Sequence, residues 1–389
     1  MQLSGPHNMN FISEERLNQL MADELDFLFI MDMDGKILFT NIATHSLLGY
    51  GNEIVGCNFI SLYLPQHREE VGVMFPLVAK GDVEHCPFPL QKKGRGVVPV
   101  DTKFYVGWWN EENVLVANGS SEILEKLFFA FGGPNRNIVF PMPSFSMYNI
   151  YAKLSESEAK VVPLNEDYTL NVEKFVQTVQ DCDAKLAVLC TPNNPTGTVV
   201  SVADIEYIAK NIACPLAVDE AYVEFYGVSA ASLLEKYPNL IVARTFSKAY
   251  GLAAARVGYM LAGKDIIHMV GKACMPYHVN VMSLATAAIV YQMRDEFVPR
   301  IQMYVAERKR MAEGLAKLAG VTVYPSETNF ILMHHEKSAE LNAYLESLKI
   351  GVRSFGNAPG LTNCLRITIG TREENDQWFS AIKGFVERN

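Results

Sequence analysis

Short apolar runs that alternate with helical patterns constrain the fold of this chain from about residue 113 onward. Such runs occur at 138–140, 187–190, 216–219 and 241–243, and turn-forming or polar residues follow each of them. This alternation is typical of a mostly parallel sheet, because parallel strands need a crossover segment to connect them. In such sheets, ligands bind at the carboxyl ends of the strands. The pattern therefore predicts an α/β domain whose functional residues follow its strands.

The run 239–243 leads directly into a loop that contains Lys248. A lysine is usually a solvated surface charge, so Lys248 by itself would indicate nothing. Thr245, Ser247 and Arg256 lie close to it in the sequence. Two hydroxyls and a planar guanidinium suit a bound phosphate better than they suit a plain surface turn. We therefore predict an anion site beside Lys248.

Two other strand ends carry side chains that could serve a bound aromatic ring. Asp219 ends one apolar run, and Tyr222 follows three residues later. A carboxylate beside a pyridine nitrogen keeps that nitrogen protonated, so that the ring can accept electrons. Asn194 lies in a proline-rich turn whose fixed backbone could aim its amide at the ring. Without Lys248, Asp219 and Tyr222 would be read as ordinary turn and core residues.

The segment 113–125 is interpreted as a strand, a turn at Gly119 and a helix. Ser120 or Ser121 could be the N-cap of this helix, with a glutamate in its first turn. The backbone amides at the start of the helix could also bind a phosphate. Both interpretations can hold together.

Five motifs in a fixed order give the chain a family resemblance. They are Asn118-Gly-Ser-Ser-Glu122, Pro141-Met-Pro-Ser-Phe-Ser-Met-Tyr148, Asn193-Asn-Pro-Thr-Gly197, Val218-Asp-Glu-Ala-Tyr222 and Ser247-Lys-Ala-Tyr-Gly-Leu252. From about residue 112 onward, the chain resembles a fold-type I aminotransferase of the histidinol-phosphate aminotransferase family. The resemblance implies a large domain over 112–290, a smaller C-terminal α/β domain over 291–389, a homodimer, and pyridoxal 5'-phosphate as cofactor.

The resemblance also implies a role for each candidate residue of the cofactor site. Lys248 would form the Schiff base and then move the proton, which is covalent catalysis followed by general acid–base catalysis. Asp219 would face the pyridine nitrogen and Tyr222 the phenolic oxygen, completing the predicted catalytic set. Phe145 would stack on the ring, where many relatives carry tyrosine. The other predicted cofactor contacts are Gly119, Ser120, Ser121, Asn194, Thr245, Ser247 and Arg256.

Three residues would bind the substrates. Arg366 matches the arginine that holds the carboxylate of the amino donor, and Arg353 matches one that helps to bind a phosphate. Guanidinium groups suit both anions, and Asn329 would line the same pocket. The expected reaction is transamination of histidinol phosphate with 2-oxoglutarate and glutamate as the other pair, in histidine biosynthesis. An alternative keeps this chemistry but uses an aromatic amino acid.

The sequence before residue 112 lacks two features of this family. We find neither the N-terminal arm nor the tyrosine that reaches the neighbouring subunit's cofactor phosphate, so the large domain is expected to be truncated at its N-terminus. A different class of function therefore stays open. In that alternative the protein is a sensory or binding protein whose aminotransferase-like half turns over weakly.

The N-terminal segment has its own pattern. Residues 25–41 are interpreted as a hairpin around an Asp-Gly turn, 42–48 as a helix, and 86–90 and 97–106 as strands. Residues 14–111 resemble an α+β PAS sensor domain on this pattern. A PAS domain binds a small ligand or another PAS domain, and the sequence does not indicate which.

No cofactor is predicted for this N-terminal segment. Cys57 is interpreted as a buried structural cysteine, and His45, His67 and His85 as ordinary surface or hydrogen-bonded histidines. The seven cysteines of the chain include no C-x-x-C pair, which argues against a disulfide framework and a zinc site. We therefore predict no metal.

Charge and hydropathy restrict the partners. The net charge of −9 argues against nucleic acid and against an anionic membrane surface. No apolar run approaches roughly 18 residues, and the first residues lack the basic and apolar regions of a signal peptide. We expect a cytoplasmic enzyme that acts on small molecules.

Overall fold

The computed structural model describes residues 29–31, 35–79, 85–94, 96–100, 102–103, 114–275 and 278–388. The chain divides into two compact units, Met1–Trp109 and Asn110–Asn389. The three domains expected from the sequence, with their bounds at 14–111, 112–290 and 291–389, stay predictions.

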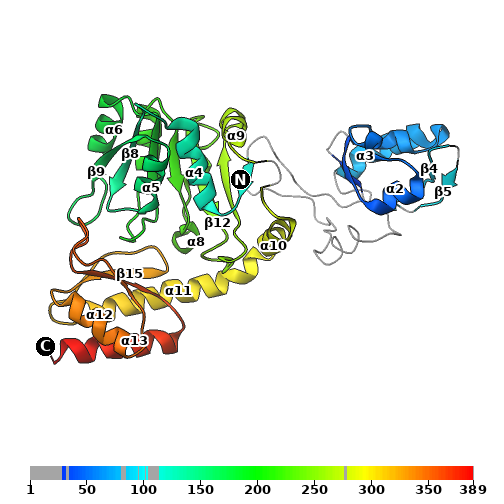
Figure 1. Ribbon diagram of the computed structural model, residues 1–389. Coiled ribbons are helices and arrows are strands. Elements are labelled where there is room, and N and C mark those ends of the chain that lie inside the picture. Colours follow the sequence, from blue (N-terminus) through cyan, green and yellow to red (C-terminus); the bar gives the residue numbers. More distant parts are fainter. Residues whose placement is uncertain are drawn as a thin grey trace. The chain divides into compact units, whose positions relative to one another are not determined.

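A seven-stranded sheet forms the centre of the second unit (Figure 1). Five neighbouring strands run parallel, as the sequence predicts, and the two strands at one edge pair in antiparallel fashion. The strands, in spatial order, are β7 (Val114–Ala117), β13 (Gly258–Ala262), β12 (Leu240–Thr245), β11 (Leu216–Asp219), β10 (Leu186–Cys190), β8 (Asn137–Met142) and β9 (Glu158–Pro163).

Both faces of this sheet are covered, which explains why its strands are apolar throughout. Along β10, Val188 and Cys190 belong to one core cluster while Ala187 and Leu189 belong to the other. Side chains alternate across a strand, so each apolar run serves both faces. One cluster includes α4 (Ser120–Phe131), α5 (Met147–Leu154) and α9 (Lys264–Gly271), and the other includes α6 (Val172–Asp181) and α7 (Val202–Asn211).

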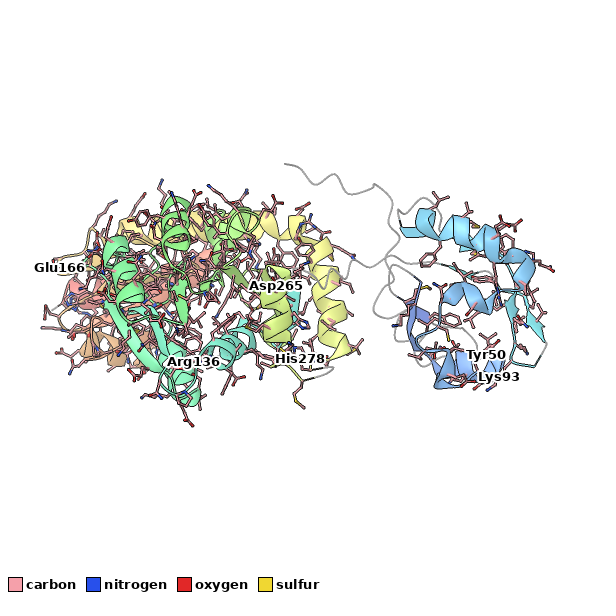
Figure 2. All side chains as sticks on the ribbon, turned by 90° about the horizontal axis from the view of Figure 1, so that it is seen from above. Tyr50, Lys93, Arg136, Glu166, Asp265 and His278 are labelled. Atoms are coloured by element: carbon pink, nitrogen blue, oxygen red, sulfur yellow. The ribbon has the colours of Figure 1, made fainter. Side chains whose placement is uncertain are left out.

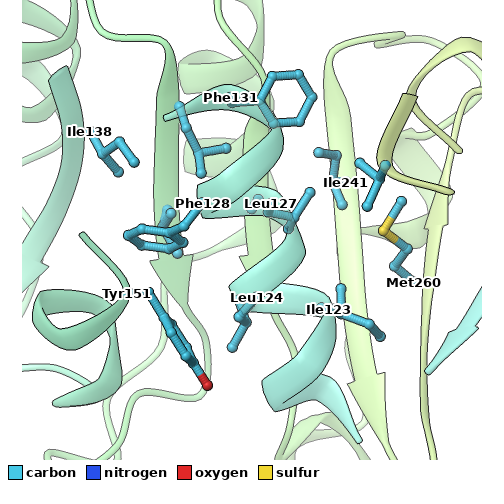
Figure 3. Close-up of a cluster of buried hydrophobic side chains, with 14 of the residues drawn as sticks. Ile123, Leu124, Leu127, Phe128, Phe131, Ile138, Tyr151, Ile241 and Met260 are labelled. Atoms are coloured by element: carbon cyan, nitrogen blue, oxygen red, sulfur yellow. The ribbon is translucent and has the colours of Figure 1, made fainter. Parts of the chain in front are cut away.

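Helix α4 supplies much of the first cluster. Ile123, Leu124, Leu127 and Phe128 follow the spacing of one helix face and are fully or almost fully buried (Figure 3). Burying each such side chain contributes about 1.5–3 kcal/mol. The first turn of α4 is thereby held firmly at the edge of the sheet where the strands end.

A smaller antiparallel sheet lies in the C-terminal part of the second unit, with the strand order β14-β15-β17-β16. The sequence predicts strands around Phe330 and Leu365 and a helix over 298–318, and all three are confirmed. The elements of this part are α11 (Arg294–Leu315), β14 (Thr322–Val323), β15 (Phe330–His334), α12 (Ser338–Ser347), β16 (Arg353–Ser354), β17 (Cys364–Thr368) and α13 (Arg372–Val386). Two further helices of the unit are α8 (Val223–Tyr226) and α10 (Val281–Gln292).

The first unit has a small core of its own. The predicted hairpin and helix are confirmed as β1 (Phe29–Met31), β2 (Ile37–Thr40) and α2 (Ile42–Leu48). Phe59 packs edge-on against Phe29 and Tyr63, with ring centroids 5.0 and 5.2 Å away. The elements between α2 and the remaining strands are η1 (Asn52–Ile54), η2 (Phe59–Leu62), η3 (Pro65–His67) and α3 (Arg68–Ala79).

The strands expected at 86–90 and 97–106 are wrong in extent within the described residues. The structure has β3 (His85–Cys86) paired with β6 (Thr102–Lys103), and β4 (Leu90–Gln91) paired with β5 (Val97–Val98). Pro87, Pro89 and Pro99 lie in the interruptions. Proline has no N–H to donate to a strand ladder, so it divides each expected strand in two. The resemblance to a PAS domain stays a prediction.

One prediction about a single residue of the first unit, Cys57, can be compared with the structure. Cys57 is exposed, so its interpretation as a buried cysteine is wrong, and its thiol donates to the Glu53 carbonyl at 3.4 Å. In the described part of the chain, no group of three or more His, Cys, Asp or Glu side chains is arranged to hold a metal ion. No helix among the described residues is long and apolar enough to span a membrane.

His45 and His67 make a hydrogen-bond contact and a stacking contact, both of which are common for histidine. His45 Nε2 lies 2.7 Å from Thr40 Oγ1, at hydrogen-bond distance. The ring of His67 stacks on Phe88, with centroids 4.9 Å apart. The backbone of His85 belongs to β3, and its side chain lies outside the described residues.

Candidate active site

The predicted site residues come from the ends of neighbouring strands in the large sheet. Asp219 is the last residue of β11, and Thr245 is the last residue of β12. Asp219 pairs in register with Cys190 at the end of β10, from which the chain continues to Asn194. Gly119 follows the end of β7, an edge strand of the same sheet. The parallel register aligns the ends of β10, β11 and β12, and the two antiparallel pairings through β13 bring the end of β7 to the same edge.

Asp219 is a buried carboxylate with defined partners. It is 3% exposed, and Tyr148 Oη donates a hydrogen bond to its Oδ2 at 2.9 Å. The Ala221 amide donates to Oδ1 at the longer distance of 3.3 Å. Burial raises the pKa of Asp219 to about 6, although the Tyr148 bond and the charge of Lys248 act in the opposite direction. A cationic group placed against Oδ1 would relieve the cost of this buried charge.

Lys248 follows β12 and remains accessible to solvent. Its Nζ lies 5.3 Å from the centre of the Tyr222 ring. Desolvation by the surrounding groups lowers the pKa of Lys248, and the positive charges of Arg366 and Arg256 lower it further. A lysine of this kind carries the unprotonated amine more often than a surface lysine does, so it can act as a nucleophile and as a base.

Tyr222 lies beside Lys248 and is buried. Its ring meets Phe330 edge-on, with centroids 5.3 Å apart. Burial raises the pKa of Tyr222, whereas the charge of Arg366 lowers it. The phenol therefore stays protonated at neutral pH and can donate a hydrogen bond.

The anion site that the sequence predicts near Gly119 would lie at the N-terminus of α4. The N-cap residue is Gly119 itself, with φ of 80°, and no side chain caps the helix. The interpretation of Ser120 or Ser121 as the N-cap is therefore wrong. A helix start that lacks a side-chain cap leaves its amides to a ligand, and the helix dipole favours an anion there.

Arg256 approaches the same place from the segment before β13. Its Nη2 donates to the Asn118 carbonyl at 3.4 Å, and its Nη1 donates to Ala253 O at 3.1 Å. A Cβ atom on Gly119 would lie 2.7 Å from Arg256 Nη2, so glycine is needed for this approach. A guanidinium and a helix N-terminus together suit a phosphate-sized anion.

The hydroxyls of the predicted anion site are held in a short network. Thr245 Oγ1 donates to Ser247 Oγ at 2.9 Å, and the Ser247 amide donates to Thr245 Oγ1 at 3.1 Å. Burial raises the pKa of Tyr151, and Ser121, in the first turn of α4, lowers it. The hydroxyls of Thr245 and Ser247 are thus positioned by each other.

Asn118 connects this edge of the sheet to the segment before α10. Its Nδ2 donates to Glu122 Oε2 and to the His278 carbonyl, both at 2.9 Å. His278 is labelled in Figure 2, and its Nε2 lies 3.2 Å from the Val116 carbonyl. The two contacts of His278 join segments far apart in the sequence and hold the turn that carries Gly119.

Gly258 gives a first testable prediction. A Cβ atom there would lie 2.3 Å from the Ser120 amide nitrogen and 2.8 Å from the Arg244 carbonyl, so Gly258→Ala must push the first turn of α4 away from the sheet. We expect a loss of about 1–3 kcal/mol in the free energy of unfolding, as for other overpacked sites. Urea denaturation measures it. Gly271→Ala is the control because nothing lies within 4 Å of its Cβ, and equal stability of both variants would contradict the prediction.

Arg366 reaches the site from the smaller sheet. Its Nη1 donates to Asn194 Oδ1, and its guanidinium lies 4.9 Å from the centre of the Phe330 ring. Its Nε is buried without a hydrogen-bond partner among the residues that the structure describes, and burial lowers the pKa of Arg366. The Asn194 side chain therefore binds this arginine in the structure. Among the described residues, Arg366 forms no ion pair with a carboxylate.

The other two predicted substrate residues lie near Arg366 in the small sheet. Arg353 faces Arg366 across the antiparallel pair of β16 and β17, and its exposed guanidinium lies 5.9 Å from the Phe355 ring. Asn329 is half-buried, and its carbonyl accepts the Ile369 amide at 2.8 Å. The structure thus brings two guanidinium groups to neighbouring positions.

Sequence reasoning missed an ion pair that stabilises the strand ends. Glu220, which is 1% exposed, accepts a hydrogen bond from Arg244 Nε at 3.0 Å, and Ser229 Oγ bonds to both side chains. Glu220 and Arg244 directly neighbour Asp219 and Thr245 in the chain, so they point to the opposite face. The signal was present in the sequence as a charged residue beside each site residue.

Comparisons with known proteins agree with this geometry. Residues 105–382 match the aminotransferase class I and II family. The chain is 39% identical over 272 residues to the histidinol-phosphate aminotransferase of Caldanaerobacter subterraneus subsp. tengcongensis, which covers 70% of this chain and 77% of that protein. It is 42% identical over 269 residues to histidinol-phosphate aminotransferase 1 of Carboxydothermus hydrogenoformans, covering 68% of this chain and 75% of that protein.

A solved structure is similar as well. The histidinol-phosphate aminotransferase from Sinorhizobium meliloti, in complex with pyridoxal-5'-phosphate, superimposes with a TM-score of 0.65 at 25% identity. The match covers 71% of this chain and 77% of that protein.

Proposed function

This chain belongs to the aminotransferase class I and II family, and we propose that it exchanges an amino group between histidinol phosphate and 2-oxoglutarate, with pyridoxal 5'-phosphate as cofactor. The observation that carries the proposal is the convergence of Lys248, Asp219 and Arg366. Lys248 Nζ lies 5.3 Å from the centre of the Tyr222 ring, three residues after Asp219. Tyr222 meets Phe330 edge-on, and the Arg366 guanidinium lies 4.9 Å from the same Phe330 ring. An amine, a buried acid and a buried cation are the side chains that amino-group transfer requires.

The residues fit pyridoxal phosphate in three respects. Asp219 is a buried acid that a protonated ring nitrogen would neutralise, Arg256 lies at a helix start that lacks a side-chain cap, and Lys248 has a lowered pKa. Asp219 would hold the ring nitrogen, and the start of α4 together with Arg256, Thr245 and Ser247 would hold the phosphate. When bound, the cofactor supplies a carbonyl that takes up the amino group and a ring that accepts electrons.

Lys248 would move the proton at the reacting carbon of the substrate. A lysine with the ordinary pKa of about 10.4 is almost entirely protonated at neutral pH and so cannot accept a proton. Desolvation lowers the pKa of Lys248 and so favours this role. Tyr222 stays protonated beside it and would donate a hydrogen bond to the phenolic oxygen of the ring. Phe145, half-buried and two residues before α5 begins, would stack against the ring face.

Arg366 would hold the carboxylate of glutamate or 2-oxoglutarate. Its buried Nε has no partner, and a bound carboxylate would supply the anion that this guanidinium lacks. Arg353, one strand away and exposed, would reach the phosphate of histidinol phosphate. Asn329 would line the same space.

The direct test is a half-reaction. The protein loaded with pyridoxal phosphate is mixed with histidinol phosphate, and the change in visible absorbance is followed; 2-oxoglutarate is then added and glutamate is measured. Turnover supports the proposal. A loaded protein that ignores histidinol phosphate but reacts with phenylalanine would support the aromatic alternative, and one that ignores every amino donor would support a binding protein.

The variant Arg353→Gln should affect the binding of histidinol phosphate more than the binding of glutamate. We expect the KM for histidinol phosphate to rise roughly tenfold, since a lost hydrogen bond to a charged group corresponds to about 1.5–3 kcal/mol. The KM for glutamate should change less than about twofold. Arg300→Gln, an exposed arginine on α11, is the control. Equal KM values for histidinol phosphate in both variants would remove Arg353 from the phosphate site.

We also propose that the chain forms a homodimer. Exposed apolar side chains on and beside α10 support a second copy, since contiguous exposed apolar surface often marks an interface. They are Met275, Val281, Met282, Tyr291 and Met293. Light scattering tests this, and a monomeric mass at micromolar concentration would contradict it.

The remaining proposals concern the domain bounds and the localisation, and they are supported by composition and by the sequence pattern. We propose a PAS-like domain over 14–111, a large domain over 112–290 and a small domain over 291–389, in a cytoplasmic protein. The hairpin, helix α2 and separate core of the first unit support the first of these. Limited proteolysis followed by mass spectrometry would test the bounds.

A further inference from the structure

Tyr148 is the buried side chain that donates a hydrogen bond to the Asp219 carboxylate. It is the second residue of α5 and is fully buried in the core cluster formed by α4, α5 and the sheet. Its Oη donates to Asp219 Oδ2 at 2.9 Å. This bond joins residues on different elements, 71 positions apart in the chain. A phenol at this depth meets a carboxylate only because the fold brings the two together.

The bond determines the direction in which Asp219 presents its charge. A hydrogen bond to an ionised acceptor is short and strong, so it fixes the carboxylate plane. Oδ2 is occupied by Tyr148, whereas Oδ1 receives only the longer bond from the Ala221 amide among the described residues. Oδ1 is therefore the oxygen that is available to a ring nitrogen.

Tyr148 also contacts the predicted stacking residue. Its ring meets the Phe145 ring at an interplanar angle of 86°, with centroids 5.6 Å apart. Edge-to-face pairs prefer this arrangement. On its other sides, Tyr148 packs against Phe128 and Phe140, so it cannot shift without disturbing the core. One buried residue thus touches two side chains of the cofactor site.

We propose that Tyr148 is a positioning residue for the reaction, whose hydroxyl orients Asp219 toward the ring nitrogen and whose ring edge sets the plane of Phe145. The inference rests on the proposed function. Tyr148 touches neither substrate nor cofactor in this proposal and acts through the two side chains that do.

Other titratable groups lie around Asp219. The charge of Lys248, in the loop after β12, lowers the pKa of Asp219, and the charge of Glu220, the next residue in the chain, raises it. Asp219 in turn raises the pKa of Cys190, Tyr222 and Tyr151. The Tyr148 hydrogen bond lowers the pKa of Asp219, which burial raises. Removing the hydroxyl should therefore raise this pKa further.

The test is Tyr148→Phe, which removes the hydroxyl and keeps the ring. In the loaded protein, we expect kcat to fall about 10- to 100-fold, the range found when outer hydrogen-bond partners of metal ligands are removed. The KM values for both substrates should stay within about twofold, and the acid limb of the kcat profile should move to higher pH. Tyr148→Leu, which also loses the ring contact, should in addition weaken binding of pyridoxal phosphate, measured by fluorescence titration.

Tyr168→Phe is the matched control. Tyr168 is also buried, and its hydroxyl donates to the Gly360 carbonyl at 2.8 Å, away from Asp219. This control should lose thermal stability without any shift of the pH profile. The proposal is overturned if Tyr148→Phe keeps the kcat and pH profile of the unmodified protein, or changes them no more than Tyr168→Phe does.

A failure of the proposed function can be told apart from a failure of this inference. If the unmodified protein does not transaminate, the visible absorbance of the loaded protein still titrates with pH. A shift of that titration in Tyr148→Phe, and its absence in Tyr168→Phe, would uphold the role of Tyr148. Identical titrations in all three proteins would refute it.

Discussion

Lys248→Ala is expected to lower kcat by on the order of 10³- to 10⁴-fold, because it removes both the nucleophile and the general base. The visible absorbance that depends on the lysine should be lost as well. Single-turnover kinetics with an amino donor measure the rate, and an absorbance spectrum measures the bond to the cofactor. Circular dichroism should be unchanged, since Lys248 is accessible to solvent and packs against the Tyr222 ring alone among the described aromatic side chains.

Lys264→Ala is the control for this variant, because Lys264 is an exposed lysine at the start of α9. It should leave the rate unchanged. A small primary amine added to Lys248→Ala should restore part of the rate, since it can carry the proton from the space that the side chain leaves. A rate within about tenfold of the unmodified protein would show that another residue moves the proton.

Asp219→Asn is expected to have the second-largest effect, a loss of roughly 10²- to 10³-fold in kcat, because a neutral amide cannot keep the ring nitrogen protonated. The amide oxygen can still accept the Tyr148 hydrogen bond, so the geometry should survive. Asp183→Asn, whose carboxylate is 85% exposed, is the control and should retain full activity. Full activity in Asp219→Asn would exclude this carboxylate from the chemistry.

The same substitution should stabilise the cofactor-free protein. The pKa of Asp219 is about 6 in the folded protein and 3.8 as its ordinary value, so the folded state favours the protonated acid. The contribution to stability is present below pH 4 and is lost as the pH rises through 6. The difference between the two pKa values corresponds to about 3 kcal/mol in the free energy of unfolding. Above pH 7, cofactor-free Asp219→Asn should therefore unfold at a higher temperature than the unmodified protein. An equal or lower unfolding temperature would contradict the raised pKa of Asp219.

The ends of the strands could be predicted from the sequence because they are marked by residues that are neighbours in the chain. An apolar run followed by Asp219 or by Thr245 identifies both the strand and the polar residue that ends it. The mostly parallel sheet followed from the same runs, and the family motifs assigned a role to each site residue. The predicted strands at 86–90 and 97–106 are wrong in extent for a local reason as well. Pro87, Pro89 and Pro99 lie within these ranges, and a proline interrupts a strand because it has no N–H to donate.

The N-cap of α4 shows a different limit. Serine is a common N-cap, so Ser120 and Ser121 were reasonable candidates. The structure has Gly119 as the N-cap instead, with a φ of 80° that other residues rarely adopt, and the Arg256 guanidinium lies against this position. A cap preference read from neighbours in the sequence cannot include an arginine 137 positions away.

By itself, the sequence determined the mostly parallel sheet of the second unit and the family, and it predicted the residues of the cofactor site. Only the tertiary structure decided which side chains support them: Tyr148 behind Asp219, Asn194 on Arg366, and Gly258 beneath the start of α4. The physical reason is the range of the interactions. Periodicity and turn chemistry act between neighbours in the chain, whereas a hydrogen bond or a close backbone approach between distant segments depends on how the whole sheet and its helices pack.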